Sequence, residues 1–337
     1  MPTIFETLPG QELPVSKVTR TLAEMWQANS GPAGAGKDGV RASQLNLVLH
    51  FGASTEPEEA LELFETAVSF GQRTPCRIIV MCPESDATSE TLIRGKLCTQ
   101  CFIGESLRQT CCCEALIMNY QPGETQYLES QINQISLWLE ADLPGYYWFH
   151  RVPREMIEQK YLGFVSKFNR IVYNSNVEGP VLDTIAWPDR SKVKDFARSR
   201  LLKVLQSLGQ FLSSYEPATL MKGLTTVKVG MQSDLQGEGR NLIDWLQSCV
   251  ANCLEMAGAE AGSAAFELTE LASDAANVAT VDWDYSNDNT FRWKLDSESR
   301  LTTIEADFGK GAVSNTQIVT KMKPVEVLSE ALFFTQT

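Results

Sequence analysis

A strand–helix–strand pattern in the first third of the chain limits its fold more than any other feature. Apolar and polar side chains alternate in "QLNLVLHF", which is the period of a strand at about 43–51. The helix that follows has apolar residues at helical spacing up to Gly71, and a capping box of Thr55 and Glu58 is expected at its start. "PCRIIVMCP" is then short and apolar, as in a strand covered on both faces. Two strands joined in this way are expected to lie parallel, with a right-handed crossover.

Further elements of the same kind continue to about residue 180. "GKLCTQCFIG", "CCCEALIMNY", "LPGYYWFHRV" and "NRIVYNS" are typical of strands, and helices are expected at about 124–139 and 154–168. Residues 41–180 are therefore predicted to form an α/β domain, a helix-covered mixed or parallel sheet. Residues 1–40 are predicted to form an N-terminal helix and a glycine-rich linker.

The second half of the chain has a different character. A long helix is expected in "RSKVKDFARSRLLKVLQSLGQFLSSY", followed by the strand "GLTTVKVG" and the helix "GEGRNLIDWLQSCVANCLEMAG". From about residue 264, short alternating segments separated by turn residues indicate a β-meander. Residues 181–337 are therefore predicted to form a smaller α+β domain with a mainly antiparallel sheet.

The segment "SGPAGAGKDG" (30–39) nearly matches a phosphate-binding loop. Gly31, Gly36 and Lys37 fit the spacing G-x-x-x-x-G-K, but Asp38 stands where a hydroxyl should hold magnesium. The loop also follows a helix and precedes a strand, whereas a phosphate loop joins a strand to a helix. We interpret the segment as a flexible connector without a nucleotide site.

Net charge and hydropathy exclude several classes of protein. The formal net charge of −13 argues against binding to nucleic acid or to an anionic membrane surface, since both require basic residues. The sequence has no apolar run of about 18 residues and no basic start followed by an apolar stretch. These features predict a cytoplasmic protein.

The chain contains nine cysteines and two histidines. In a reducing compartment structural disulfides are rare, so the thiols are expected to be free. Three interpretations stay open for the group at the two strands after residue 94: small core residues, a zinc site, or a redox-active thiol set. The candidate redox thiols are Cys98, Cys101, Cys111, Cys112 and Cys113.

No catalytic constellation is evident in the sequence. It lacks G-x-S-x-G, H-E-x-x-H and G-x-G-x-x-G, and no cofactor or metal ion is predicted. Asp282 and Asp284 flank Trp283 on one strand, where they are expected to be solvated. The aromatic run "GYYWFHRVP" includes Trp148 and Arg151, residue types that protein interfaces favour. Those two residues are candidate partner contacts, and a doubly covered central strand is the alternative.

Several segments resemble the OpcA family, the glucose-6-phosphate dehydrogenase assembly proteins. "FETAVSFGQRTPCRIIVM" is similar to the helix–strand signature of that family, with Thr74–Arg77 at its His-Pro-Cys-Arg-like positions. "LPGYYWFHRVP" resembles its L-P-D-x-P…W-W segment, with Phe149 at the second Trp. "FNRIVYNSN" resembles its R-x-I-x-D-S motif, with Asn174 at the Asp, and "GEGRNLIDWLQSCV" its small-domain helix. The likeness extends over roughly residues 40–260.

The resemblance implies a function without catalysis. Such proteins bind glucose-6-phosphate dehydrogenase, promote its active oligomer and raise its activity in the oxidative pentose phosphate pathway. Thioredoxin is implied as a second partner, because a thiol switch acts through the assembly protein in photosynthetic relatives. Two alternatives remain: an α/β nucleotide-binding enzyme, and a thiol redox sensor that acts by itself.

Overall fold

The computed structural model describes residues 2–29, 43–84, 93–103, 110–122, 128–258 and 264–334. The glycine-rich segment 30–39 lies outside these ranges. The chain divides into two compact units. The first comprises residues up to Tyr173, the segment Pro180–Asp195 and the C-terminal segment from Pro324, and the second comprises Asn174–Gly179 and Phe196–Lys323. Compared with the predicted boundaries, the N-terminal residues and the C-terminal segment both belong to the α/β unit.

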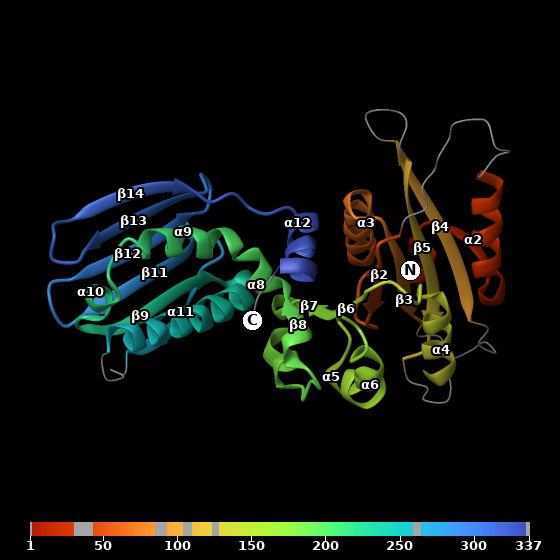
Figure 1. Ribbon diagram of the computed structural model, residues 1–337, viewed down its shortest axis with the longest axis horizontal. Coiled ribbons are helices and arrows are strands. Elements are labelled where there is room, and N and C mark those ends of the chain that lie inside the picture. Colours follow the sequence, from red (N-terminus) through yellow and green to blue (C-terminus); the bar gives the residue numbers. More distant parts are fainter. Residues whose placement is uncertain are drawn as a thin grey trace. The chain divides into compact units, whose positions relative to one another are not determined.

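The first unit is built on an eight-stranded mixed sheet in the order β1-β4-β5-β3-β2-β6-β7-β8 (Figure 1). All neighbours from β5 to β8 are parallel, whereas β4 runs antiparallel to both β5 and β1. The strands are β1 Gln11–Pro14, β2 Leu45–Phe51, β3 Cys76–Pro83, β4 Arg94–Ile103, β5 Thr110–Tyr120, β6 Gly145–His150, β7 Arg170–Tyr173 and β8 Val193–Asp195.

Helices cover both faces of this sheet. The main helical segments are α1 Ile4–Thr7, α2 Val15–Asn29, α3 Pro57–Arg73, α4 Leu128–Trp138, α5 Arg154–Met156, a π-helical turn Ile157–Tyr161, α6 Leu162–Val165 and α12 Pro324–Ser329. Residues of α2, α4 and the α5–α6 region share one core with β2, β3 and β6. Helix α3 covers the opposite face, where it contacts α1 and α12. Since both faces are covered, every residue of β2 is buried.

The second unit pairs a six-stranded sheet with helices on one face only. The strand order is β10-β9-β11-β12-β13-β14, and all neighbours are antiparallel except β9 and β10. Its elements are α7 Ser175–Glu178, α8 Phe196–Arg200, α9 Leu202–Leu212, α10 Pro217–Met221, β9 Leu224–Gln232, α11 Gln236–Ala257, β10 Ala265–Leu271, β11 Asn277–Tyr285, β12 Thr290–Asp296, β13 Leu301–Asp307 and β14 Val313–Ile318. Side chains of α9, α10 and α11 form the core with one face of the sheet. Residues of β12 and β13 alternate between buried and exposed, because the other face is open.

The expected fold class is confirmed: an α/β unit with a mixed sheet and a smaller unit with a mostly antiparallel sheet. The start of one expected helix was predicted wrongly. Val193–Asp195, expected at the start of a long helix, forms strand β8 because it pairs in parallel with β7. Among the described residues, no helix combines the length and hydropathy needed to cross a membrane.

Candidate functional site

The order of the parallel strands shows where a ligand site would be expected. The parallel strands lie side by side in the order β5-β3-β2-β6-β7-β8. Along the chain, strands are added outward from β2 on one side of the sheet, and then outward from β6 on the other side. This is the order of dinucleotide-binding domains, in which ligands bind outside the carboxyl ends of the strands at the point of reversal. The corresponding place here lies beyond Phe51 of β2 and His150 of β6.

At this place the ends of β2 and β6 are joined by the backbone. The amide nitrogen of Gly52 donates to the carbonyl oxygen of His150 at 2.7 Å. A Cβ atom built on Gly52 would lie 1.7 Å from the carbonyl oxygen of Arg151, so no side chain fits there. Arg151 itself has a left-handed backbone, with φ of 56°. Glycine is therefore required at residue 52, because the backbone that follows β6 lies directly against it.

Three side chains form a charged cluster beside the same strand ends. Glu59, from the first turns of α3, accepts two hydrogen bonds from the Arg151 guanidinium, from Nε at 2.8 Å and from Nη2 at 3.1 Å. Nε2 of His150 lies 3.0 Å from Oε1 of Glu59. Burial opposes the ionisation of Glu59, but Arg151 and His150 outweigh it and lower the pKa of this carboxyl. Burial also lowers the pKa of His150, despite the neighbouring Glu59.

The start of α3 is poorly suited to a phosphate group. Its first turn carries Glu58 and Glu59, and its N-cap residue is Glu56. The capping box expected from Thr55 and Glu58 is wrong, because the helix begins one residue later than that motif requires. Helix N-termini bind anions through free amides and a positive dipole end, and carboxylates occupy that position here. The residues at this site do not fit the pyrophosphate of a dinucleotide.

The two candidate partner contacts have different outcomes. Trp148 is 3% exposed inside β6, so its proposed contact with a partner is wrong. The strand is a doubly covered central strand, the alternative that the aromatic run also allowed. Arg151 has a side chain that is 36% exposed, but it is engaged with Glu59. A role for Arg151 in partner binding stays a prediction.

The candidate redox thiols lie on the β4–β5 hairpin. Cys98 is opposite Ala115 and Gln100 is opposite Cys113, so Cys98 and Cys113 are on the same face. Both are free, and burial raises the pKa of Cys98. The side chains of Cys101, Cys111 and Cys112 lie outside the described part of the chain. Among the described residues no group of three or more potential metal ligands occurs. The redox assignment stays a prediction, and a raised thiol pKa does not favour the reactive thiolate.

Sequence reasoning missed the surroundings of a buried histidine, His50. The rings of Tyr120, Tyr147, Phe149 and Tyr161 surround His50, with ring centroids 4.8–5.9 Å away. Its Nδ1 lies 2.9 Å from the Tyr147 hydroxyl. The alternation of apolar and polar side chains identified the strand, but it gave His50 no role. Complete burial instead lowers the pKa of His50 to about 3.

This histidine is expected to make the stability of the protein depend on pH. The unfolded chain binds a proton at His50 below about pH 6.5, whereas the folded chain does so only near pH 3. The contribution of neutral His50 to the free energy of unfolding is therefore fully present above pH 6.5. It decreases as the pH falls toward 3, by at most about 1.4 kcal/mol per pH unit. The free energy of unfolding, measured with urea at pH 7 and pH 5, should decrease between these pH values by roughly 2 kcal/mol less in His50→Phe than in the wild type. Equal losses in both proteins would contradict the assignment.

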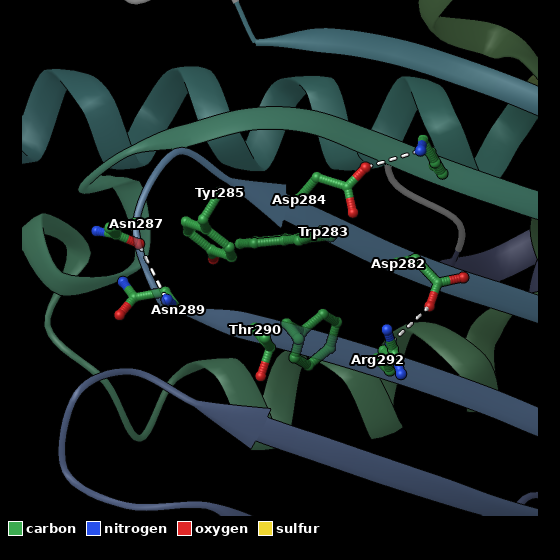
Figure 2. A pocket seen from close by; sticks show the side chains of 10 residues that line it. Asp282, Trp283, Asp284, Tyr285, Asn287, Asn289, Thr290 and Arg292 are labelled. Carbon is green, nitrogen blue, oxygen red and sulfur yellow. Dashed lines mark hydrogen bonds and ion pairs between the residues drawn. The ribbon is translucent and has the colours of Figure 1, made fainter.

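The second unit has a polar hollow of about 520 Å³ at the turn between β11 and β12 (Figure 2). Asp282, Asp284 and Arg292 lie along it on the open face of the sheet, as the sequence predicted for the two aspartates. Lys228 Nζ is 2.7 Å from Oδ2 of Asp284, and Arg292 Nε is 3.9 Å from Oδ1 of Asp282. Burial raises the pKa of Asp282, although Arg292 opposes this. The charges of the hollow are thus paired with one another across the strands.

Comparisons with known proteins add little to this description. No family model matches the sequence, and no curated protein matches it. Among solved structures, the chain is similar to an aldose-aldose oxidoreductase from Caulobacter crescentus determined with glycerol. The two are 9% identical, the alignment covers 85% of this chain and 87% of that chain, and the TM-score is 0.39. No correspondence between site residues follows from so distant a likeness.

Proposed function

We propose that this protein is a non-catalytic partner of glucose-6-phosphate dehydrogenase that promotes the active oligomer of that enzyme. The proposal starts from the sequence segments that resemble the dehydrogenase assembly proteins. The observation that supports it most directly is the closed end of the sheet at β2 and β6. At the strand ends where a dinucleotide-binding domain holds its cofactor, Gly52 lies against the backbone of Arg151, and Arg151 is paired with Glu59.

The residues of the resembling segments have structural roles in the fold. Arg77, in the helix–strand signature, makes a buried ion pair with Glu114 at 2.9 Å. Asn174, in the R-x-I-x-D-S-like motif, caps α7 and accepts a hydrogen bond from Arg200 at 2.8 Å. These contacts account for the residue types without any reacting group. They are compatible with a protein that works through its folded surface.

An activator of this kind acts by differential binding. It must bind the active state of the dehydrogenase more tightly than the inactive state, since equal affinity shifts no equilibrium. A tenfold shift in favour of the active oligomer requires about 1.4 kcal/mol of differential binding. That amount is within reach of one well-packed contact region, so a large interface is not required.

The proposal is tested by adding the purified chain to purified glucose-6-phosphate dehydrogenase. We expect the enzyme rate at subsaturating substrate to rise several-fold and to saturate with the concentration of the chain. The dehydrogenase should also shift to a larger species that co-elutes with the chain in size-exclusion chromatography. An unchanged rate curve together with separate elution would refute the proposal.

A nucleotide-binding enzyme is the second candidate, and the order of the parallel strands favours it. The same preparation distinguishes the two functions by thermal unfolding with NADP or ATP at millimolar concentration. Binding to the native state would raise the melting temperature by several degrees. Under the proposed function we expect no shift with either ligand, and a shift would favour the enzyme.

A further inference from the structure

The four outer strands of the two sheets differ in how they are protected against pairing with other chains. In the first sheet, β1 is four residues long and contains Glu12 and Pro14, and β8 is three residues long. In the second sheet, β10 carries Glu267 and Glu270. Short length, charge and proline are the usual devices that prevent strand addition. The remaining outer strand, β14, has six residues, "VSNTQI", without a charge or a proline.

The backbone of β14 presents its free hydrogen-bonding groups at regular spacing. Its pairing with β13 has no register shift from Val313 to Ile318. The amide of Val319 donates to the carbonyl oxygen of Arg300 at 3.0 Å. Because backbone groups alternate in direction along an antiparallel strand, Asn315 and Gln317 also point toward β13. The amide and carbonyl groups of Ser314, Thr316 and Ile318 therefore point away from the sheet.

The side chains of this strand are exposed as well. Val313 is 44% exposed and Ile318 is 72% exposed, although both are apolar. They project on opposite faces of the strand, since five positions separate them. Leu301, the partner of Ile318 in register, is 38% exposed. A strand added at this edge would cover apolar surface on both faces.

Charges at the ends of β14 indicate which kind of strand would fit. Lys310 precedes the strand and Lys321 follows it, and both are exposed in a chain whose net charge is −13. Glu305 lies opposite Ser314 in the sheet, but Arg292 is its neighbour on the other side. Two copies of β14 paired antiparallel would bring Lys310 of one copy toward Lys321 of the other. Such pairing is unfavourable, whereas acidic residues flanking a neutral strand would be complementary.

We propose that β14 accepts an extended segment of the partner protein as a seventh strand, neutral at its centre and acidic at its ends. The inference depends on the proposed function in taking glucose-6-phosphate dehydrogenase as that partner. Backbone hydrogen bonds to Ser314, Thr316 and Ile318 supply the affinity, and the two lysines set the register of the incoming strand.

Substitution of Thr316 separates strand addition from other modes of binding. Thr316→Pro removes an outward amide and places a ring at the edge, but it leaves the hydrogen bonds to β13 intact. Thr316→Val is the matched control, because it retains the amide. We expect Thr316→Pro to weaken binding of the dehydrogenase at least tenfold and Thr316→Val to change it less than twofold, with both variants melting within a few degrees of the wild type.

Two further measurements make the test specific to the strand edge. Amide exchange at Ser314, Thr316 and Ile318 should slow when the dehydrogenase is bound, whereas Asn315 and Gln317 are already protected in the free chain. Lys310→Glu combined with Lys321→Glu should also weaken binding at least tenfold at low salt, and less at high salt.

The outcomes distinguish this inference from the proposed function. Absence of binding by the wild-type chain would refute both. Equal binding by wild type and Thr316→Pro, or unchanged exchange at the three outward amides, would refute strand addition and leave the proposed function standing. A wild-type dimer that Thr316→Pro converts to a monomer would instead assign the edge to a second copy of the chain.

Discussion

Gly52→Ala is expected to destabilise the first unit by about 3 kcal/mol or more, at the upper end of what overpacking costs. The new methyl group would lie 1.7 Å from the carbonyl oxygen of Arg151 and 2.8 Å from the amide nitrogen of Val152. Backbone atoms cannot rotate away as a flexible side chain can. The ends of β2 and β6 would have to separate, which would also break the hydrogen bond from Gly52 to His150.

Chemical denaturation measures this effect, and Gly209→Ala provides the control. Gly209 lies within α9, and a Cβ atom there would meet nothing within 4 Å. Alanine is the better helix former by about 1 kcal/mol, so this substitution should be neutral or stabilising. A Gly52→Ala protein as stable as the wild type would show that β2 and β6 are not held together as described.

Arg77→Met is expected to cost about 3–5 kcal/mol, because it leaves the carboxylate of Glu114 buried without its cation. Glu114 is fully buried, and it accepts hydrogen bonds from Nε and Nη2 of Arg77 at 3.0 and 2.9 Å. The same guanidinium donates to the carbonyl oxygen of Trp138 at 3.0 Å, which ties β3 and β5 to the end of α4.

A double substitution distinguishes the loss of a pair from the loss of packing. Arg77→Met with Glu114→Met removes both charges, and it should be more stable than Arg77→Met alone. Arg20→Ala is the matched surface control. Its ion pair with Glu24 is exposed, so its removal should change stability by less than about 1 kcal/mol. If the double variant were no more stable than Arg77→Met, the buried charge of Glu114 would not be the cause of the destabilisation in Arg77→Met.

The sequence predicted the strands of both sheets better than it predicted their surroundings. Periodicity located β2, β3 and β9–β13, because each is a local pattern bounded by turn residues. The alternation in β2 located the strand, but it did not show that its polar residues Asn46 and His50 are buried. The Asn46 amide donates to the carbonyl oxygen of Glu140 at 3.0 Å, and the Tyr147 hydroxyl lies beside His50. Such partners are distant in sequence, so a local pattern does not reveal them.

The candidate site was beyond prediction for the same reason. In the sequence Gly52 is an ordinary glycine at the end of a strand. Only glycine fits there because of the backbone of Arg151, which is nearly a hundred residues away in the sequence. Strand β8 was missed because three residues beside β7 acquire strand structure only by pairing. The absence of a glycine-rich fingerprint from the sequence stays an argument against a dinucleotide, and the cluster of Glu59, His150 and Arg151 at the strand ends became visible only with the fold.

The C-terminal segment from Pro324 belongs to the first unit, and this determines when the contacts of that unit can form during synthesis. Arg170 donates hydrogen bonds to the carbonyl oxygens of Ala331 and Phe333 at 2.8 and 3.2 Å, and the ring of Phe333 packs 5.8 Å from those of Phe70 and Tyr146. During translation these contacts can form only after the second unit has been synthesised, because residues from 324 onward follow it in the sequence, long after the rest of the first sheet is available. A nascent chain that stops before residue 324 would therefore have a first unit without α12 and without the carbonyl oxygens that Arg170 contacts.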